Sequence, residues 1–182
     1  MIVIANAVGS GDLGVELNVA GVESDLDLPY TEYDPSNYHG LYVRLVENGP
    51  LITVYRSGKY IISGCSTFEQ LYGTNDSFLT TLSELDIVDV DAETGFSVQN
   101  VVCKAQLDDS VELNALSIAL GLESVEYEPE QFPGLIYRPA DHPAVLLVFT
   151  NGKIVVTGTS DVDTAEDAFD HLQEQVTTHL EQ

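Results

Sequence analysis

The sequence predicts an α+β fold in which one unit of about ninety residues occurs twice. Three observations lead to this prediction: the two halves align, each half carries strand patterns joined by tight turns, and each half carries two helical patterns. The aligned identities include Asn6 with Asn100, Tyr33 with Tyr127, Gly40 with Gly134, and Gly58-Lys59 with Gly152-Lys153. We therefore expect a first repeat over residues 1–94 and a second over residues 95–182.

The strand patterns give each copy the order β-α-β-β-β-β-α with antiparallel pairing. Each copy opens with an apolar strand, Ile2–Gly9 or Phe96–Gln106. A short strand after the first helix ends at Tyr33 or Tyr127, and three more strands follow. A tight turn joins the last two of them. Asn151-Gly152 is its clearest signal, because both residues tolerate positive φ.

The helical patterns are clearest in the second copy. Leu113, Leu116 and Leu120 recur at helical spacing, and Gly121 supplies a stop. The last helix of each copy is expected to begin at a capping pattern, Ser66-x-x-Glu69 or Ser160-x-x-Asp163. Its predicted apolar face is Phe68, Leu71, Tyr72, Leu79 and Leu82 in the first copy and Ala165, Phe169, Leu172 and Val176 in the second.

The charge of the chain is strongly acidic, with 30 Asp and Glu residues against 6 Lys and Arg residues and a formal net charge of −24. Its apolar content is nevertheless normal for a folded domain. Such a surface fits a cytoplasm that holds molar salt, where self-repulsion is screened and carboxylates keep the protein hydrated. An ordinary acidic protein from a low-salt cell is the alternative. No apolar run approaches the roughly 20 residues that span a bilayer, so we expect no membrane association and a cytoplasmic location.

One face of the predicted sheet has no helix to cover it, because two helices per copy cover only one side of five strands. If Leu146 and Val148 point at the helices, Leu147 and Phe149 point away from them. The same alternation places Val155 and Thr157 on the second face, and in the first copy Thr53, Tyr55, Ile61 and Ser63. An uncovered apolar face indicates an interaction surface, unless the two copies stack face to face.

The six basic residues include two repeat-related pairs, Arg44 with Arg138 and Lys59 with Lys153. Because positive charge is so scarce in this chain, its retention at equivalent places favours contacts with the phosphates of a nucleic acid. Local ion pairs with the surrounding acidic residues are the alternative.

Motifs for catalysis are missing from the sequence. There is no phosphate-binding loop, no zinc-protease motif and no nucleophile elbow, so we predict that the chain is not an enzyme and has no cofactor or metal. The histidines are expected to face solvent: His39, His142, His171 and His179. Cys65 and Cys103 lack metal-ligand spacing and are expected to be small buried apolar residues.

Three segments of the second copy, VQNVVCKAQLD, VEYEPEQFPGLIYR and VLLVFTNGKIVVTG, closely resemble the TATA-box-binding protein family in its archaeal form. The first copy is similar in outline but more divergent, as in TEYDPSNYHGLYVR and ITVYRSGKYIISG. The resemblance covers nearly the whole chain. It implies a saddle: two pseudo-symmetric repeats forming a curved ten-stranded antiparallel sheet, with four helices on the convex face. Together with the acidity it indicates a haloarchaeal member.

The family resemblance also implies site residues and partners. The concave face would bind and bend double-stranded A·T-rich promoter DNA in the minor groove. The residues implied to contact DNA are Asn6, Val8, Tyr38, Arg44, Thr53, Tyr55, Lys59, Ile61, Ser63, Asn100, Val102, Phe132, Arg138, Leu147, Phe149, Lys153, Val155 and Thr157. Glu128 and Glu130 would receive a TFIIB-like transcription factor, and RNA polymerase would be recruited indirectly.

The first copy departs from the family at the positions that insert between bases, where Tyr38 and Tyr55 replace two phenylalanines and His39 follows the first of them. A buried phenol needs a hydrogen-bond partner. This leaves a second function open: a divergent paralogue that binds the TFIIB-like factor with weak or no DNA binding. The sequence also leaves open whether free protein dimerises through the concave face.

Overall fold

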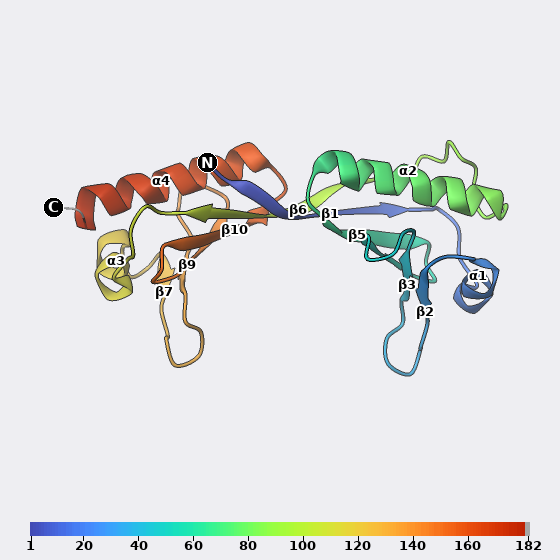
Figure 1. Ribbon diagram of the computed structural model, residues 1–182, viewed down its shortest axis with the longest axis horizontal. Coiled ribbons are helices and arrows are strands. Elements are labelled where there is room, and N and C mark those ends of the chain that lie inside the picture. Colours follow the sequence, from blue (N-terminus) through green and yellow to red (C-terminus); the bar gives the residue numbers. More distant parts are fainter. Residues whose placement is uncertain (181–182) are drawn as a thin grey trace. The chain divides into compact units, whose positions relative to one another are not determined.

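The computed structural model describes residues 1–180 and places ten strands and four helices within them (Figure 1). The chain divides into two compact units. The first-repeat unit is Asn6–Gln99, and the second-repeat unit joins Met1–Ala5 to the chain from Asn100 onward. Both follow the predicted element order. The repeat boundary at residues 94 and 95 stays a prediction of the sequence.

The first-repeat unit contains an antiparallel sheet with the strand order β2-β3-β4-β5-β1. The strands are β1 (Val3–Asp12), β2 (Tyr30–Glu32), β3 (Leu41–Arg44), β4 (Leu51–Val54) and β5 (Lys59–Cys65). Helix α1 (Val19–Asp25) follows β1, and the long helix α2 (Phe68–Glu84) follows β5 and packs against it. The β2–β3 loop projects on the side of the sheet opposite α2 (Figure 1).

The second-repeat unit has the equivalent antiparallel sheet, with the order β6-β10-β9-β8-β7. Its strands are β6 (Ser97–Gln106), β7 (Val125–Glu126), β8 (Leu135–Tyr137), β9 (Val145–Val148) and β10 (Lys153–Thr159). Helix α3 (Leu113–Leu120) packs against α4 (Val162–Leu180), and α4 packs against β10. The β7–β8 loop projects away from α4 (Figure 1).

The core of each unit lies between its sheet and its long helix, as strand alternation predicts. Ile52 and Ile62 are fully buried in the first sheet, and Leu146 and Val148 in the second. Helix α2 contributes Leu71, Leu79 and Leu82 from the predicted apolar face, and also Phe78 and Asn75, which the prediction missed.

The helix ends follow standard capping chemistry, but two of the predicted caps were wrong by one residue. The side chain of Thr67 accepts a hydrogen bond from the Gln70 amide at 3.0 Å, so Thr67 and not Ser66 caps α2. In the same way Asp161 precedes α4 and accepts from the Thr164 amide at 3.0 Å. Each long helix begins with a hydroxyl or carboxylate that satisfies an otherwise free backbone N–H group. Helix α3 ends at Gly121 as predicted, with φ 95°.

The predicted hairpins are present, with a different turn from the one that the sequence suggested. The Gly152 amide donates to the Phe149 carbonyl at 2.9 Å, and the Phe149 amide donates to the Lys153 carbonyl at 3.0 Å. Only Gly152 has positive φ (79°), while Asn151 does not. A type I turn closed by a left-handed glycine therefore joins β9 to β10, and Gly58 (φ 90°) has the same role between β4 and β5.

A polar cluster lies inside the core of the first-repeat unit. The buried hydroxyl of Tyr60 hydrogen-bonds the Asn75 side chain at 2.5 Å and the Thr94 hydroxyl at 3.0 Å. The Phe96 ring stacks on Tyr60 with its centroid 5.9 Å away. Thr94 and Phe96 follow α2, so this connecting segment completes the core of the first repeat. Burial raises the pKa of Tyr60 above its usual value.

The histidines were only partly predicted correctly. His39 and His179 are exposed, but His142 and His171 are half-buried and stack at 4.7 Å between ring centres. The Tyr137 hydroxyl lies 3.0 Å from His171 Nε2. Cys65 and Cys103 are fully buried and unpaired, as predicted, and burial raises the pKa of both thiols. Within residues 1–180 no helix is long and apolar enough to cross a membrane.

Candidate nucleic-acid interface

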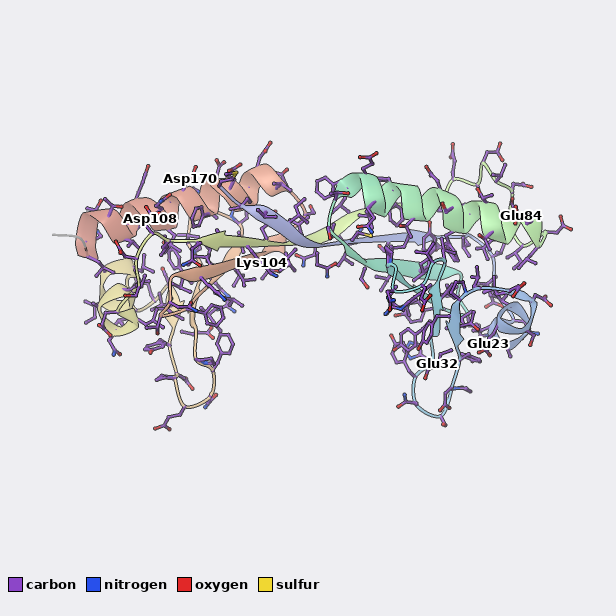
Figure 2. All side chains as sticks on the ribbon, viewed as in Figure 1. Glu23, Glu32, Glu84, Lys104, Asp108 and Asp170 are labelled. Carbon is purple, nitrogen blue, oxygen red and sulfur yellow. The ribbon has the colours of Figure 1, made fainter. Side chains whose placement is uncertain are left out.

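Each sheet has a face that the long helix of its unit does not cover, here called the open face. It is formed by the residues that alternate with the core: Asn6, Val8, Thr53, Tyr55, Ile61 and Ser63 in the first-repeat unit, and Asn100, Val102, Leu147, Phe149, Val155 and Thr157 in the second. Most are partly exposed, while Ile61 is 36% exposed and Thr53 only 9%. Figure 2 shows side chains along this side of both sheets. Two open faces of mainly apolar and neutral polar side chains are therefore available for binding.

An asparagine sits at the same irregularity of pairing in both sheets. Gly64 and Gly158 have left-handed backbones, with φ 84° and 80°, near register shifts in the β1–β5 and β6–β10 pairing. The Asn6 side-chain oxygen accepts from the Gly64 amide at 2.7 Å, and the Asn100 oxygen accepts from Gly158 at 3.2 Å. This fixes the orientation of both carboxamides. Their NH₂ groups are left as hydrogen-bond donors on the open faces.

The second-repeat unit carries a bare aromatic pair. The rings of Phe132, in the β7–β8 loop, and Phe149, after β9, meet edge to face with centroids 5.8 Å apart. Gly134 lies directly under them, since a Cβ there would come within 2.8 Å of Phe132 and 3.0 Å of Phe149. Glycine is therefore required at this position by the close approach of the rings.

The first-repeat unit has a larger, polar aromatic cluster at the same place, formed by Tyr38, His39, Tyr42 and Tyr55. The Tyr38 and Tyr55 hydroxyls hydrogen-bond each other at 2.7 Å. The Tyr42 ring stacks on Tyr38 at 5.4 Å, and His39 lies 4.6 Å from the Tyr38 ring and 5.2 Å from the Tyr55 ring. Burial, followed by the Tyr38 hydrogen bond, raises the pKa of Tyr55 to about 12, so this phenol stays neutral at physiological pH.

Two cations line a hollow beside each aromatic pair. A hollow of about 710 Å³ in the first-repeat unit is lined by Arg56, Lys59 and Tyr55 among others. The equivalent hollow of about 590 Å³ in the second-repeat unit is lined by Lys104, Lys153 and Phe149. Lys104 projects from β6 in Figure 2. Four of the six basic residues of the chain therefore gather at two equivalent places.

The remaining two basic residues, Arg44 and Arg138, are engaged within their own units. Arg138 forms an exposed ion pair with Glu126 at 2.8 Å, the only ion pair found within residues 1–180. The Arg44 guanidinium donates to the Gly49 carbonyl and lies 5.8 Å from the centre of the Tyr30 ring. Of the two interpretations given for the basic residues, phosphate contact or a local ion pair, the local ion pair is therefore observed for Arg138. An exposed pair of this kind contributes little stability and exchanges readily for another anion.

A family model described as "Transcription factor TFIID (or TATA-binding protein, TBP)" matches the chain over residues 1–85 and again over 95–179. The chain belongs to the TATA-binding-protein family. Members of this family are DNA-binding transcription factors, which confirms the predicted family and the prediction that the chain is not an enzyme.

Similar proteins come from halophilic archaea. The chain is 65% identical over 173 residues to TATA-box-binding protein C of Halobacterium salinarum, across 95% of this chain and 96% of that one. It is 42% identical over 174 residues to TATA-box-binding protein B of the same organism, across 96% and 92%. The solved structure of Methanococcus jannaschii TBP matches with a TM-score of 0.81 at 32% identity, across 97% of this chain and 98% of that one. The fold class is confirmed, and so is the predicted likeness to proteins of halophilic archaea.

Three residues beside the candidate interface were missed by the sequence reasoning. Arg56 and Lys104 were not selected because their repeat equivalents, Thr150 and Ser10, are uncharged. They nevertheless line equivalent hollows, so the second charge of each hollow comes from the β4–β5 turn in one repeat and from β6 in the other. Tyr42 was also missed. The only available signal was its position two residues before Arg44, on the same side of the short strand β3.

Proposed function

We propose that this protein is a general transcription initiation factor of the cytoplasm that binds A·T-rich promoter DNA in the minor groove, bends it, and presents it to a TFIIB-like factor and RNA polymerase. The DNA-contacting residues would be those of the two open faces, the aromatic pairs and the basic residues. The observation that carries the proposal is the fixed orientation of Asn6 and Asn100.

These asparagines present donors to a groove that offers acceptors. In the minor groove an A·T pair shows only the adenine N3 and thymine O2 acceptors, whereas a G·C pair adds an amino donor. The oxygens of Asn6 and Asn100 are already taken by Gly64 and Gly158, so only their NH₂ groups face outward. One proton of Asn100 also reaches the Thr157 hydroxyl at 3.2 Å, which leaves the other free. The asparagines thus offer donors that match the acceptors of an A·T pair, but no acceptor for the amino group of a G·C pair. This favours A·T pairs over G·C pairs.

The aromatic pairs supply the means of bending. Phe132 and Phe149 are partly exposed at one edge of the open face, where apolar side chains inserted between base steps unstack and kink DNA toward the major groove. The apolar residues Leu147 and Val155 face each other across β9 and β10 and would contact the floor of the widened groove. Tyr38 and Tyr55 occupy the equivalent place in the first repeat.

The β7–β8 loop supplies a surface for the TFIIB-like factor. Glu128 and Glu130 are both exposed at this loop, which projects away from α4 (Figure 1). The Phe132 amide donates to the Glu128 carbonyl at 3.0 Å, so the acidic residue and the inserting ring belong to one turn. An acidic loop next to the DNA fits a basic surface on the partner.

Binding should strengthen with salt, because a protein with a net charge of −24 and a DNA duplex repel each other at low ionic strength. Counterion release ordinarily weakens DNA binding as salt rises. Here cations must instead be taken up between carboxylates and phosphates. A titration from about 0.2 M to about 2 M KCl should raise the affinity, and a fall would contradict the halophilic mechanism.

The test is fluorescence anisotropy of a TATA-containing duplex at molar KCl, with and without the TFIIB-like factor, against a G·C-rich duplex as control. Tight binding confined to the A·T-rich duplex supports the proposal. Glu128→Gln with Glu130→Gln should then abolish the contribution of the factor. Asp34→Asn, at the equivalent position of the β2–β3 loop, is the matched control and should leave that contribution in place.

A protein-binding paralogue is the second candidate. The mutual hydrogen bond of Tyr38 and Tyr55 and the engagement of Arg44 and Arg138 within the chain favour it, since all four residues are already partnered without DNA. Capture of the TFIIB-like factor by a protein that binds no duplex at any salt concentration would favour this candidate and reject DNA binding.

A further inference from the structure

We propose that the Tyr38–Tyr55 pair makes the first repeat tolerant of a G·C pair in its half of the DNA site, so that promoter composition sets the direction in which the protein binds. This inference rests on the proposed minor-groove binding. It concerns the one place where the two open faces differ most in chemistry.

The tyrosine pair can both donate and accept. When one hydroxyl donates to the other at 2.7 Å, the accepting hydroxyl keeps its proton for an outside acceptor, and lone pairs remain on both oxygens. The pair can therefore donate to adenine N3 or thymine O2, or accept from the guanine amino group. The Tyr55 phenol remains neutral near neutral pH, since burial and the Tyr38 hydrogen bond raise its pKa to about 12.

The phenylalanine pair can do neither. Phe132 and Phe149 adopt the same edge-to-face arrangement, with centroids 5.8 Å apart against 6.3 Å for the tyrosines. Their ring tips carry no polar atom, so a guanine amino group buried against them loses its water without gaining a partner. A buried donor left unsatisfied is penalised, and the second repeat is expected to reject G·C.

The tyrosine rings are held in place by neighbours that the phenylalanines lack. Tyr42 stacks on Tyr38, and His39 packs against both tyrosine rings. The equivalent second-repeat positions are Ile136 and Pro133. Gly40 lies beneath the cluster, where a Cβ would approach Tyr38 and Thr53 to 2.8 Å. The hydroxyls are thus preorganised for recognition.

The first experiment compares three duplexes at molar KCl: an all-A·T core, the same core with one G·C pair at one end, and the core with a G·C pair at each end. Each affinity is expressed relative to the all-A·T core, so that a uniform change in binding does not count. We expect one G·C pair to change the affinity less than threefold and two to reduce it about tenfold, because only the first repeat accepts guanine.

Two paired variants test the hydroxyls. In Tyr38→Phe with Tyr55→Phe, a single G·C pair should already reduce relative affinity about tenfold. Replacing guanine by inosine, which lacks the amino group, should remove that penalty. In Phe132→Tyr with Phe149→Tyr, the duplex with two G·C pairs should bind like the duplex with one. Thermal unfolding of each variant checks that the fold is kept.

Binding direction is read separately by energy transfer. Cys65 and Cys103 are fully buried, so a dye can be attached at Val46→Cys, an exposed position of the first-repeat unit that is 59% accessible. A second dye is placed at the G·C end of the duplex. We expect high energy transfer when both tyrosines are present. In Tyr38→Phe with Tyr55→Phe this transfer should fall, because the directional preference is lost.

The outcomes separate this inference from the proposed function. Wild-type protein that binds the all-A·T core but is weakened equally by each added G·C pair, with no preferred direction, overturns the inference and leaves the function standing. Penalties that inosine does not relieve also overturn it. Failure to bind any duplex overturns both.

Discussion

In the first repeat the residue on β5 beneath α2 is Tyr60, whose hydroxyl bonds Asn75 and Thr94, whereas the equivalent residue on β10 beneath α4 is the apolar Ile154. The open faces differ in the same direction. Tyr38, Tyr55 and Thr53 in the first repeat correspond to Phe132, Phe149 and Leu147 in the second. The backbone frame is shared by the two copies, while the first copy is the more polar. Strand pairing and left-handed glycines therefore define the fold, and side chains on both sides of the sheet can diverge.

The largest effect is expected from removing the aromatic pair of the second repeat. Phe132→Ala with Phe149→Ala should weaken DNA binding by about 1–3 kcal/mol per ring and remove bending. Both residues are partly exposed, so the thermal unfolding midpoint should change little. Bending is measured by energy transfer across an end-labelled duplex. The matched variant is Tyr38→Ala with Tyr55→Ala. A larger loss of DNA affinity from that variant would show that the first repeat, and not the second, contributes more to binding.

Next in size is the conversion of the central donors to acceptors. Asn6→Asp keeps the oxygen that accepts from Gly64 but replaces NH₂ with a charged acceptor, and should reduce A·T binding by about 2 kcal/mol or more. In Asn100→Asp the Thr157 hydroxyl, which accepts from the amide, would instead donate to the carboxylate, so the effect should be of similar size. Anisotropy titrations measure both variants. Unchanged affinity in either would reject the donor–acceptor argument.

A smaller effect concerns stability. Tyr60→Phe leaves the side chains of Asn75 and Thr94 without a partner in a buried site, and should reduce the free energy of unfolding by about 1–3 kcal/mol. Ile154→Val at the equivalent position should cost only about 0.5–1.5 kcal/mol, because it removes one methylene from an apolar site. Urea unfolding at molar KCl compares the two. Equal losses of unfolding free energy would show that the hydrogen bonds of Tyr60 add no more stability than apolar packing at the same place.

The smallest effect is spectroscopic. Tyr55 should ionise at about pH 12, well above an ordinary tyrosine, as followed by tyrosinate absorbance. Because the folded-state pKa is raised, the folded form holds this proton more tightly. Its contribution to stability is complete below about pH 10 and is lost as pH rises through about 12. Tyr38→Phe should lower the pKa of Tyr55, while Tyr42→Phe should change it less.

Much of this fold could be predicted because its signals are periodic and occur twice. The alternation of Leu146 and Val148 with Leu147 and Phe149 assigned both faces of β9 correctly. The caps at Thr67 and Asp161 were placed one residue early, since neighbouring hydroxyl and carboxyl residues offer equivalent signals in the sequence. The half-buried pair His142 and His171 was missed because residues from a loop and from α4 meet only in three dimensions.

The candidate site was less predictable than the fold. The repeat alignment identified Asn6 and Asn100, but not that Gly64 and Gly158 fix the direction of their amides, because a bulge has no strong sequence signature. It also overlooked Arg56 and Lys104, whose charges occupy one hollow per repeat through different positions in the chain. A comparison of aligned positions cannot detect a charge that has moved between neighbouring elements.

The segment that carries Thr94 and Phe96 has a consequence for how such a chain evolves. A gene duplication first produces two interchangeable copies joined by a spacer. Here the join is part of a core: Thr94, the last residue of the first repeat, completes the Tyr60 cluster, and the ring of Phe96, at the start of the second, stacks on Tyr60. A gene fission placed after α2 would strip the first copy of part of its core. The two halves can therefore no longer exchange places in the chain, and further divergence between them is favoured.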